Sequence, residues 1–258
     1  MYSWLCPAAV RAPARAVTAL RSRQLGTVQQ EPARLTQCVQ DAGVRTDKVR
    51  LRWSRGVNSR RGRHGMKMGG AVPDLRHPSE QDHPWLMTAI QTIPVPVIAQ
   101  VNGLATAAGC QLVASCDIAV ASEKSRFATP GVNVGLFCST PAVALGRAVP
   151  RKVALEMLFT GEPISAHDAL MHGLVSKVVP EDRLEAETMK IASKICQASR
   201  TVVALGKATF YKQISQSLEE AYKLTSQVML QNLMLKDGQE GIEAFTQKRK
   251  PVWTNSLE

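Results

Sequence analysis

The feature that most constrains the fold is a run of β-branched residues that leads into a turn and then into a stretch of very small residues. Residues 94–101, Pro-Val-Pro-Val-Ile-Ala-Gln-Val, predict a buried strand that the chain enters from an extended proline segment. Asn102-Gly103 is a turn signal, and residues 104–114 are rich in Ala. Residues 117–121 predict a second short buried strand. Short strands that alternate with a helix indicate an α/β fold.

The pattern beyond this segment predicts further strands and a helix with clear boundaries. Residues 126–129 predict a third strand, and residues 174–179 predict another. Ser165 and Asp168 have the spacing of a capping box, so a helix is expected to begin there and to stop at Gly173.

Three later helices make residues 150–250 mainly helical. Pro180 is expected to open a helix that runs to about residue 196. Another helix is expected to begin at Ser217, and Gly238 and Gly241 are expected to bracket a short break before a last helix. The helix after Ser217 has an apolar face with near-helical spacing: Leu218, Ala221, Tyr222, Val228, Met229 and Leu233.

The positive charge of the chain belongs to its first third. Residues 1–80 contain 15 Lys and Arg against 5 Asp and Glu, whereas residues 81–258 contain 17 against 16. The remainder of the chain therefore has no excess of positive charge that would bind a polyanion, and nucleic acid is not an expected partner of it. Residues 1–30 carry four Arg and no acidic residue, which is typical of a mitochondrial transit peptide and predicts a matrix location.

Residues 31–84 form a basic segment that is expected to be disordered. The run Lys48–His64 is rich in Arg and Gly and has neither a sustained period of 2 nor one of 3.6. Such a composition buries too little apolar surface to offset the entropy of ordering. A nucleic-acid or heparin patch at residues 45–63 is the alternative interpretation. No apolar run is long enough to span a membrane, and the six Cys have no metal-ligand spacing with His, so neither a span nor a metal site is expected.

The stretch of small residues after the Asn-Gly turn also has a chemical interpretation. Small residues at the start of a helix leave backbone N–H groups open to a ligand, and the helix dipole favours negative charge there. One donor of an oxyanion hole is built in this way. Small residues also permit close packing of a helix on a strand, and the pattern alone leaves the two interpretations equal.

Several motifs of the chain, over about residues 85–253, resemble the enoyl-CoA hydratase/isomerase (crotonase) superfamily. The matching motifs are Asn102-Gly103, Ala107-Ala108-Gly109, Cys116-Asp117 and residues 127–135, 158–165, 169–175 and 248–250. The resemblance implies a crotonase-like α/β fold. It consists of a ββα spiral core over residues 85–178 and a C-terminal helical region over residues 179–258 that forms trimers or hexamers.

The resemblance also implies a site for an acyl-CoA thioester, with coenzyme A as part of the substrate and no separate cofactor. Two backbone N–H groups of the family bind the thioester oxygen. One of them maps onto Ala108, and Gly109 beside it belongs to the same substrate-binding segment. Phe245 and Lys248 match positions that contact the adenine and phosphates of CoA in relatives, often from a neighbouring subunit. Phe245 as a core residue and Lys248 as a solvated cation are the alternatives.

Two departures from the family pattern limit the expected chemistry. The hydratases position and deprotonate water with two glutamates, and this chain has Gln111 and Gly131 at those positions. Neither side chain can take a proton, although the Gln111 amide could orient a water molecule. Residues 31–84 also do not match the family segment that begins the spiral and supplies the second oxyanion donor, so the core is expected to be incomplete at its N-terminal side.

Together these features predict a mitochondrial crotonase-fold protein of fatty-acid metabolism. It is expected to bind acyl-CoA thioesters, and its hydratase activity is expected to be weak or absent. The alternative is a non-catalytic assembly protein that pairs with crotonase-family subunits through its C-terminal helices.

Overall fold

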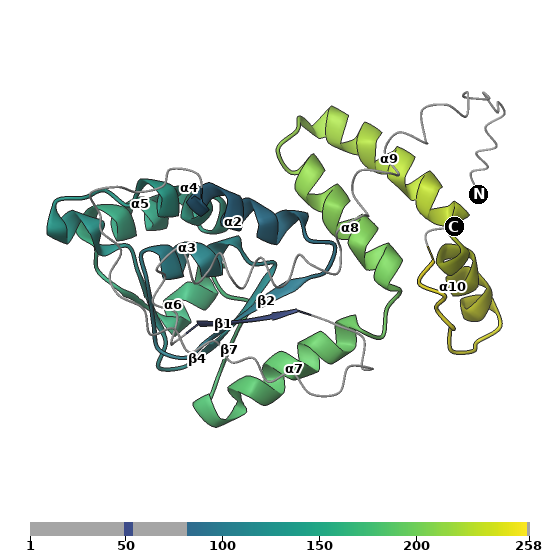
Figure 1. Ribbon diagram of the computed structural model, residues 1–258, viewed down its shortest axis with the longest axis horizontal. Coiled ribbons are helices and arrows are strands. Elements are labelled where there is room, and N and C mark those ends of the chain that lie inside the picture. Colours follow the sequence, from purple (N-terminus) through teal and green to yellow (C-terminus); the bar gives the residue numbers. More distant parts are fainter. Residues whose placement is uncertain (1–48, 54–81, 257–258) are drawn as a thin grey trace, which may run out of the picture.

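The computed structural model describes residues 49–53 and 82–256, in which helices cover two small β-sheets (Figure 1). The larger sheet has the strand order β1-β2-β4-β7. Strands β2, β4 and β7 are parallel, whereas β1 is antiparallel to β2. Its strands are β1 (Val49–Trp53), β2 (Val97–Val101), β4 (Ile118–Ser122) and β7 (Lys177–Val179).

The smaller sheet has the strand order β3-β5-β6. Strand β3 is parallel to β5, and β6 is antiparallel to β5. Its strands are β3 (Leu104–Thr106), β5 (Arg126–Ala128) and β6 (Ile164–Ser165).

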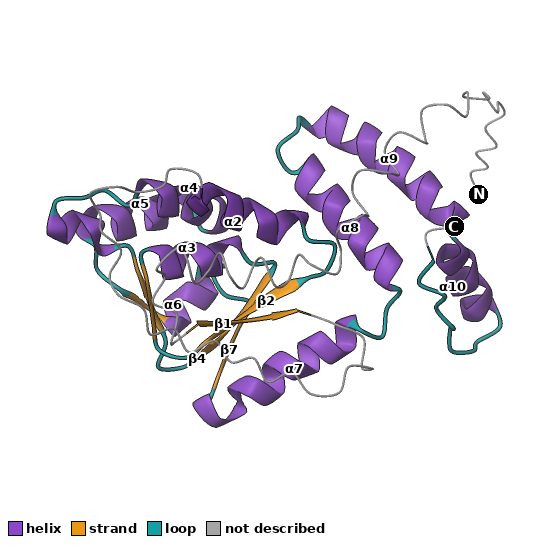
Figure 2. Ribbon diagram, viewed as in Figure 1, coloured by secondary structure: helices purple, strands orange, loops and turns teal. Residues whose placement is uncertain are grey.

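Helices occupy both faces of the larger sheet and the whole C-terminal part of the chain (Figure 2). The α-helices are α2 (Asp82–Thr92), α3 (Ala108–Ser115), α4 (Ser139–Ala148), α5 (Arg151–Thr160), α6 (Ala166–Met171), α7 (Leu184–Ile195), α8 (Arg200–Gln213), α9 (Leu218–Met234) and α10 (Lys236–Thr246). Two short 3-10 helices are η1 (Pro130–Val134) and η2 (Glu181–Arg183).

The position of β2 between two helical layers explains its unbroken apolar sequence. All five residues of β2 are buried. Its odd-numbered residues pack in the main core with side chains of α2, α3, α4 and α5, whereas Ile98 packs with Leu184 and Ala192 of α7. A strand buried on both faces needs apolar residues at successive positions, not alternating ones.

Several predicted boundaries are confirmed. The Ser165 hydroxyl accepts the Asp168 N–H at 3.1 Å, and the Asp168 carboxylate accepts the Ser165 N–H at 3.2 Å, which completes the capping box of α6. Gly173 follows the end of α6 with a φ of 83°, the conformation that ends a helix. Ser217 caps α9 by accepting the Glu220 N–H.

Two predictions around the glycines are wrong. Residues 104–106 belong to β3 and pair with β5, so the helix after the Asn-Gly turn begins only at Ala108. Gly238 and Gly241 lie inside α10, and the break falls at Leu235. A Cβ on Gly238 would lie 2.2 Å from the Asn232 carbonyl oxygen, so this glycine marks a close backbone approach.

Two other boundaries also differ from expectation. The strand predicted over residues 174–179 is only Lys177–Val179. The expectation of disorder over residues 31–84 is wrong for residues 49–53, which form β1, and for residues 82–84, which begin α2. Val-Arg-Leu-Arg-Trp alternates apolar and basic residues, and this period of two is typical of a strand. The rest of that segment and residues 1–30 lie outside the described residues.

Candidate functional site

The start of α3 presents backbone N–H groups without intrahelical acceptors. The Ala107 N–H donates to the Ala128 carbonyl of β5 at 2.9 Å, and the Gln111 N–H makes the first helical bond, to the Ala107 carbonyl at 3.0 Å. The N–H groups of Ala108, Gly109 and Cys110 lie between these two bonds. No side chain caps α3 and no acidic residue lies in its first turn, so these donors remain available to a carbonyl oxygen or anion.

The residue directly before these donors has an unusual backbone conformation. Ala107 has φ 48° and ψ −116°, a conformation that favours glycine. Open space lies beside Gly109, because a Cβ built there would meet no heavy atom within 4 Å. The predicted oxyanion residues Ala108 and Gly109 therefore carry available N–H donors, and unfilled space lies beside Gly109.

Gln111, at the first family glutamate position, lies on the same helix and is 6% exposed. Its side-chain amide has no hydrogen-bond partner among the described residues. An amide can donate and accept hydrogen bonds but cannot act as a base near neutral pH. The residue can therefore orient a water molecule and cannot deprotonate it.

Gly131, at the second family glutamate position, lies in η1, and the space for its side chain is already filled. A Cβ on Gly131 would lie 2.7 Å from the Leu136 carbonyl oxygen and 2.8 Å from Cys138 Sγ. The Gly131 N–H also donates to Cys138 Sγ at 3.3 Å. The chain therefore lacks both the carboxylate and the room for one at this position.

Cys138 is a feature of the site that sequence reasoning missed. It precedes α4, is 9% exposed, and lies near the buried Cys110 of α3. Burial, with a smaller contribution from Cys138, raises the pKa of the Cys110 thiol to about 12. Cys110 is therefore a neutral thiol at physiological pH. Nothing in the sequence relates Cys138 to Gly131, because only the fold of η1 brings them together.

Phe245 lies on α10, at the opposite end of the molecule from α3 (Figure 1). Its side chain is 86% exposed, so the alternative that it is a core residue is wrong for the single chain. The structure does not bring Phe245 and Lys248 together with the start of α3 within one chain. Lys248 follows α10 with a φ of 54° and is exposed.

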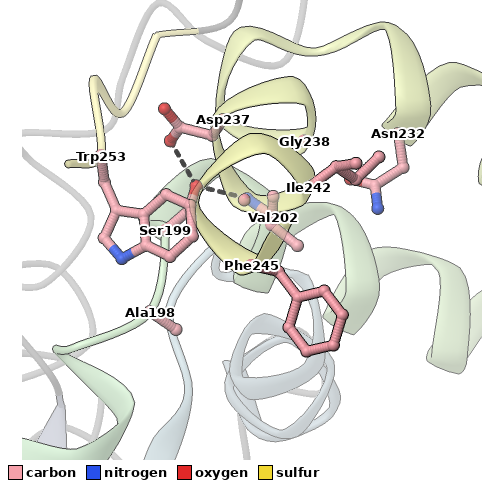
Figure 3. A pocket seen from close by; sticks show the side chains of 10 residues that line it. Ala198, Ser199, Val202, Asn232, Asp237, Gly238, Ile242, Phe245 and Trp253 are labelled. Carbon is pink, nitrogen blue, oxygen red and sulfur yellow. Dashed lines mark hydrogen bonds between the residues drawn. The ribbon is translucent and has the colours of Figure 1, made fainter. Parts of the chain in front are cut away.

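An open groove of about 440 Å³ runs beside Phe245 (Figure 3). Its wall includes a buried polar pair, in which the Ser199 hydroxyl donates to Asp237 at 2.5 Å. The groove is lined by Ala198, Ser199, Val202, Asn232, Asp237, Gly238, Gly241, Ile242, Phe245 and Trp253. The lining is mainly apolar, and Phe245 and Ile242 are more than half exposed.

Comparison with known proteins identifies the family. The model of the family described as "Enoyl-CoA hydratase/isomerase" matches residues 67–256. The chain belongs to this enoyl-CoA hydratase/isomerase family. The match contains every predicted site residue, and the crotonase fold predicted from the motifs is thereby confirmed.

Curated relatives of this enoyl-CoA hydratase/isomerase family member include proteins named "Enoyl-CoA hydratase domain-containing protein 3, mitochondrial". The Xenopus laevis protein is 80% identical over 171 residues, 66% of this chain and 58% of the relative. The human protein is 75% identical over 170 residues, 66% of this chain and 56% of the relative. The chain therefore spans less than three fifths of the length of these relatives.

Solved structures agree with this assignment. The crystal structure of human enoyl Coenzyme A hydratase domain-containing protein 3 matches with a TM-score of 0.66 and 75% identity, over 67% of this chain and 68% of that one. An enoyl-CoA hydratase of Mycobacterium smegmatis matches with a TM-score of 0.67 and 50% identity, over 69% and 72%.

Within residues 49–53 and 82–256, no helix is both long and apolar enough to cross a bilayer. Within the same ranges, no group of three His, Cys, Asp or Glu side chains is placed to hold a metal ion.

Proposed function

We propose that this chain binds acyl-CoA thioesters of fatty-acid metabolism at the start of α3 and hydrates them weakly or not at all. The observation that carries the proposal is the set of free N–H groups at Ala108, Gly109 and Cys110 beside positions 111 and 131, which lack carboxylates. The donors suit an oxyanion, and neither Gln111 nor Gly131 can supply a base.

The chemistry available to such a site is binding and polarisation. The Ala108 N–H, with Gly109 beside it, would donate to the thioester carbonyl oxygen and favour negative charge there through the dipole of α3. Gln111 would hold a water molecule by its amide without taking the proton. Coenzyme A enters as part of the substrate, and the proposal requires no separate cofactor.

We propose that the crotonase core is incomplete at its N-terminal side and therefore binds acyl-CoA weakly. The curated relatives have residues that this chain does not match. Strand β1 occupies the edge beside β2 and is antiparallel to it, whereas β2, β4 and β7 are parallel to one another. Removal of one oxyanion donor lowers the catalytic rate by ~10²–10³ in enzymes where it has been tested. If this chain lacks the second donor, its hydration rate should be lower by a similar factor.

Calorimetric titration with butyryl-CoA tests the binding site. Ala108→Pro removes the N–H at the first helical position, disturbs the start of α3 through Ala107, and should weaken binding. Ala108→Gly keeps the N–H and serves as the control. Equal affinity of the parent and Ala108→Pro would show that the proposed carbonyl site is wrong.

A crotonyl-CoA hydration assay tests the second half of the proposal. The parent should show a rate far below that of a complete hydratase from the same family, assayed side by side. A comparable rate would show that another group supplies the base.

A second candidate function is assembly, because the predicted apolar face of α9 is open in the single chain. Leu218, Tyr222 and Met229 are 75%, 67% and 59% exposed. We propose that the C-terminal helices form trimers or hexamers, or pair with crotonase-family subunits. Light scattering on Tyr222→Glu should then show a smaller particle than the parent, and Gln231→Glu, on the opposite side of α9, should not. A monomeric parent would contradict self-assembly.

The third part of the proposal is location in the mitochondrial matrix. Relatives carry the word mitochondrial in their names, and residues 1–30 have the composition of a transit peptide. A reporter fused to residues 1–30 should enter mitochondria, and changing Arg11 and Arg15 to Glu should abolish import. A cytosolic reporter from the intact fusion would contradict the proposal.

A further inference from the structure

Lys207 of α8 is a buried cation whose hydrogen bonds all end on the core. Its side chain is 6% exposed, and its Nζ donates to the Ile90 carbonyl at 2.7 Å, the Val95 carbonyl at 2.9 Å and Asp117 Oδ2 at 2.7 Å. An ammonium group has three hydrogens, so these three acceptors satisfy it fully. Burial lowers the pKa of Lys207, whereas the Asp117 carboxylate opposes that shift.

The local sequence explains why a cation is needed at this point. In a continuing helix the Ile90 carbonyl would accept the N–H of residue 94, but that residue is proline and has none. The carbonyls at the end of α2 also carry the negative end of its dipole. Lys207 therefore caps α2 from a helix that lies 117 residues further along the chain.

Asp117, which accepts a hydrogen bond from Lys207, also contacts β2 and a second residue of α8. It accepts the Val97 N–H at 2.6 Å, which sets the start of β2, and the Tyr211 hydroxyl at 2.7 Å. It also follows the end of α3 by two residues. One carboxylate thus connects α3, β2 and two successive turns of α8.

Among the described residues, the most extensive contact of helices α8, α9 and α10 with the core is that of α8 with α2. Helix α8 packs on α2, whereas α9 packs on α8, and α10 packs on both α8 and α9. Figure 1 shows α9 and α10 lying beyond α8, away from the sheet and from α3. The position of α9 and α10 relative to the core therefore depends on how α8 is held.

We infer that Lys207 is a positioning residue that fixes α8, α9 and α10 against the core and thereby sets where Phe245 and Lys248 stand. The consequence for coenzyme A rests on the proposed function. The proposed function places the carbonyl-binding half of the site on α3, and the family resemblance implies that the nucleotide-binding half is at Phe245 and Lys248. Lys207 thereby controls the nucleotide half, which would meet the α3 half of a neighbouring copy.

Hydrogen exchange measured by mass spectrometry tests directly whether Lys207 holds α8 against the core. Lys207→Met keeps an unbranched side chain that is one heavy atom shorter, and it removes the charge and the donors. Amides of α8, α9 and α10 should exchange about tenfold faster than in the parent, while those of β2 and β4 stay within about twofold. Lys212→Met, an exposed lysine on the same helix, is the matched control and should change neither.

Two results would overturn the inference. Unchanged exchange in α8 after Lys207→Met would show that the hydrogen bonds do not hold the helix. Equal acceleration in β2 and β4 would show that Lys207 holds the core itself. The double variant Lys207→Met with Asp117→Asn leaves no unpaired buried charge and should loosen α8 by less than the two single changes combined; additive effects would contradict a direct pair.

Ligand binding distinguishes a positioning role of Lys207 from a role in the general stability of the protein. Lys207→Met should weaken butyryl-CoA binding about fivefold or more, a change of about 1 kcal/mol, and should leave the binding of butyryl-pantetheine, which lacks the nucleotide, unchanged. Equal loss for both ligands would contradict positioning of the nucleotide half. If the parent binds neither ligand, the proposed function fails, while the exchange experiment still decides whether Lys207 holds the C-terminal helices.

Discussion

Replacing Ala107 by glycine should stabilise this protein. Ala107 has φ 48° and ψ −116°, and it is held there because its N–H bonds to Ala128. A non-glycine residue in such a region stores on the order of 1–3 kcal/mol of strain. Glycine lowers the free energy of unfolding by about 0.4–1 kcal/mol, because it gives the unfolded chain greater conformational freedom. The difference is a gain of about 1 kcal/mol in the free energy of unfolding, which raises Tm by about 2–4 °C for a domain of this size.

The neighbouring residue provides a matched control with the opposite sign. Ala108 is also half-buried, but it is the first residue of α3 and has ordinary helical geometry. Ala108→Gly should therefore cost about 0.5–1 kcal/mol. Urea denaturation followed by circular dichroism measures both variants. A loss of stability in Ala107→Gly equal to that in Ala108→Gly would refute the argument that strain is stored at position 107.

Three further predictions follow from side-chain contacts. Gly131→Glu should lower the free energy of unfolding by about 1–3 kcal/mol, because its Cβ would overlap Cys138 and the Leu136 carbonyl; a urea titration measures this, and an equally stable variant would contradict it. Hydrogen bonds from Arg249 lower the pKa of Glu240 to about 2, below its ordinary value of 4.5, so its stabilising contribution is complete above pH 4.5 and is lost as the pH falls toward 2. Tm measured against pH should therefore fall less steeply in this range for Glu240→Gln than for the parent, and parallel curves would contradict this. Ser165→Ala should cost about 1 kcal/mol in thermal denaturation through loss of the α6 cap, and an unchanged Tm would argue against the capping box.

Short-range patterns in the sequence predicted the elements that depend on neighbouring residues. The capping box at Ser165 and Asp168 is one example, and the strand predicted over residues 94–101, which the structure gives as Val97–Val101, is another. Capping joins residues three apart, and strand formation depends on a run of side chains of one kind, so both can be inferred without knowledge of the fold.

The prediction failed where composition was averaged over a long segment. The excess of Arg and Gly in residues 31–84 concealed the alternation in Val49–Trp53, and pairing with β2 is what makes those five residues a strand. An isolated alternating pentapeptide gains little, whereas the edge of an existing sheet supplies hydrogen-bond partners for its whole backbone.

The same division holds for the candidate site. The sequence by itself determined which groups are absent, because Gln111 and Gly131 cannot take a proton in any fold, and it located the small residues that begin α3. Only the tertiary structure decided that Cys138 fills the space beside Gly131 and that Lys207 caps the helix ended by Pro94. Local hydrogen bonding is encoded in neighbouring residues. Contacts between residues far apart in the sequence depend on how the helices pack, and that packing is a property of the whole chain.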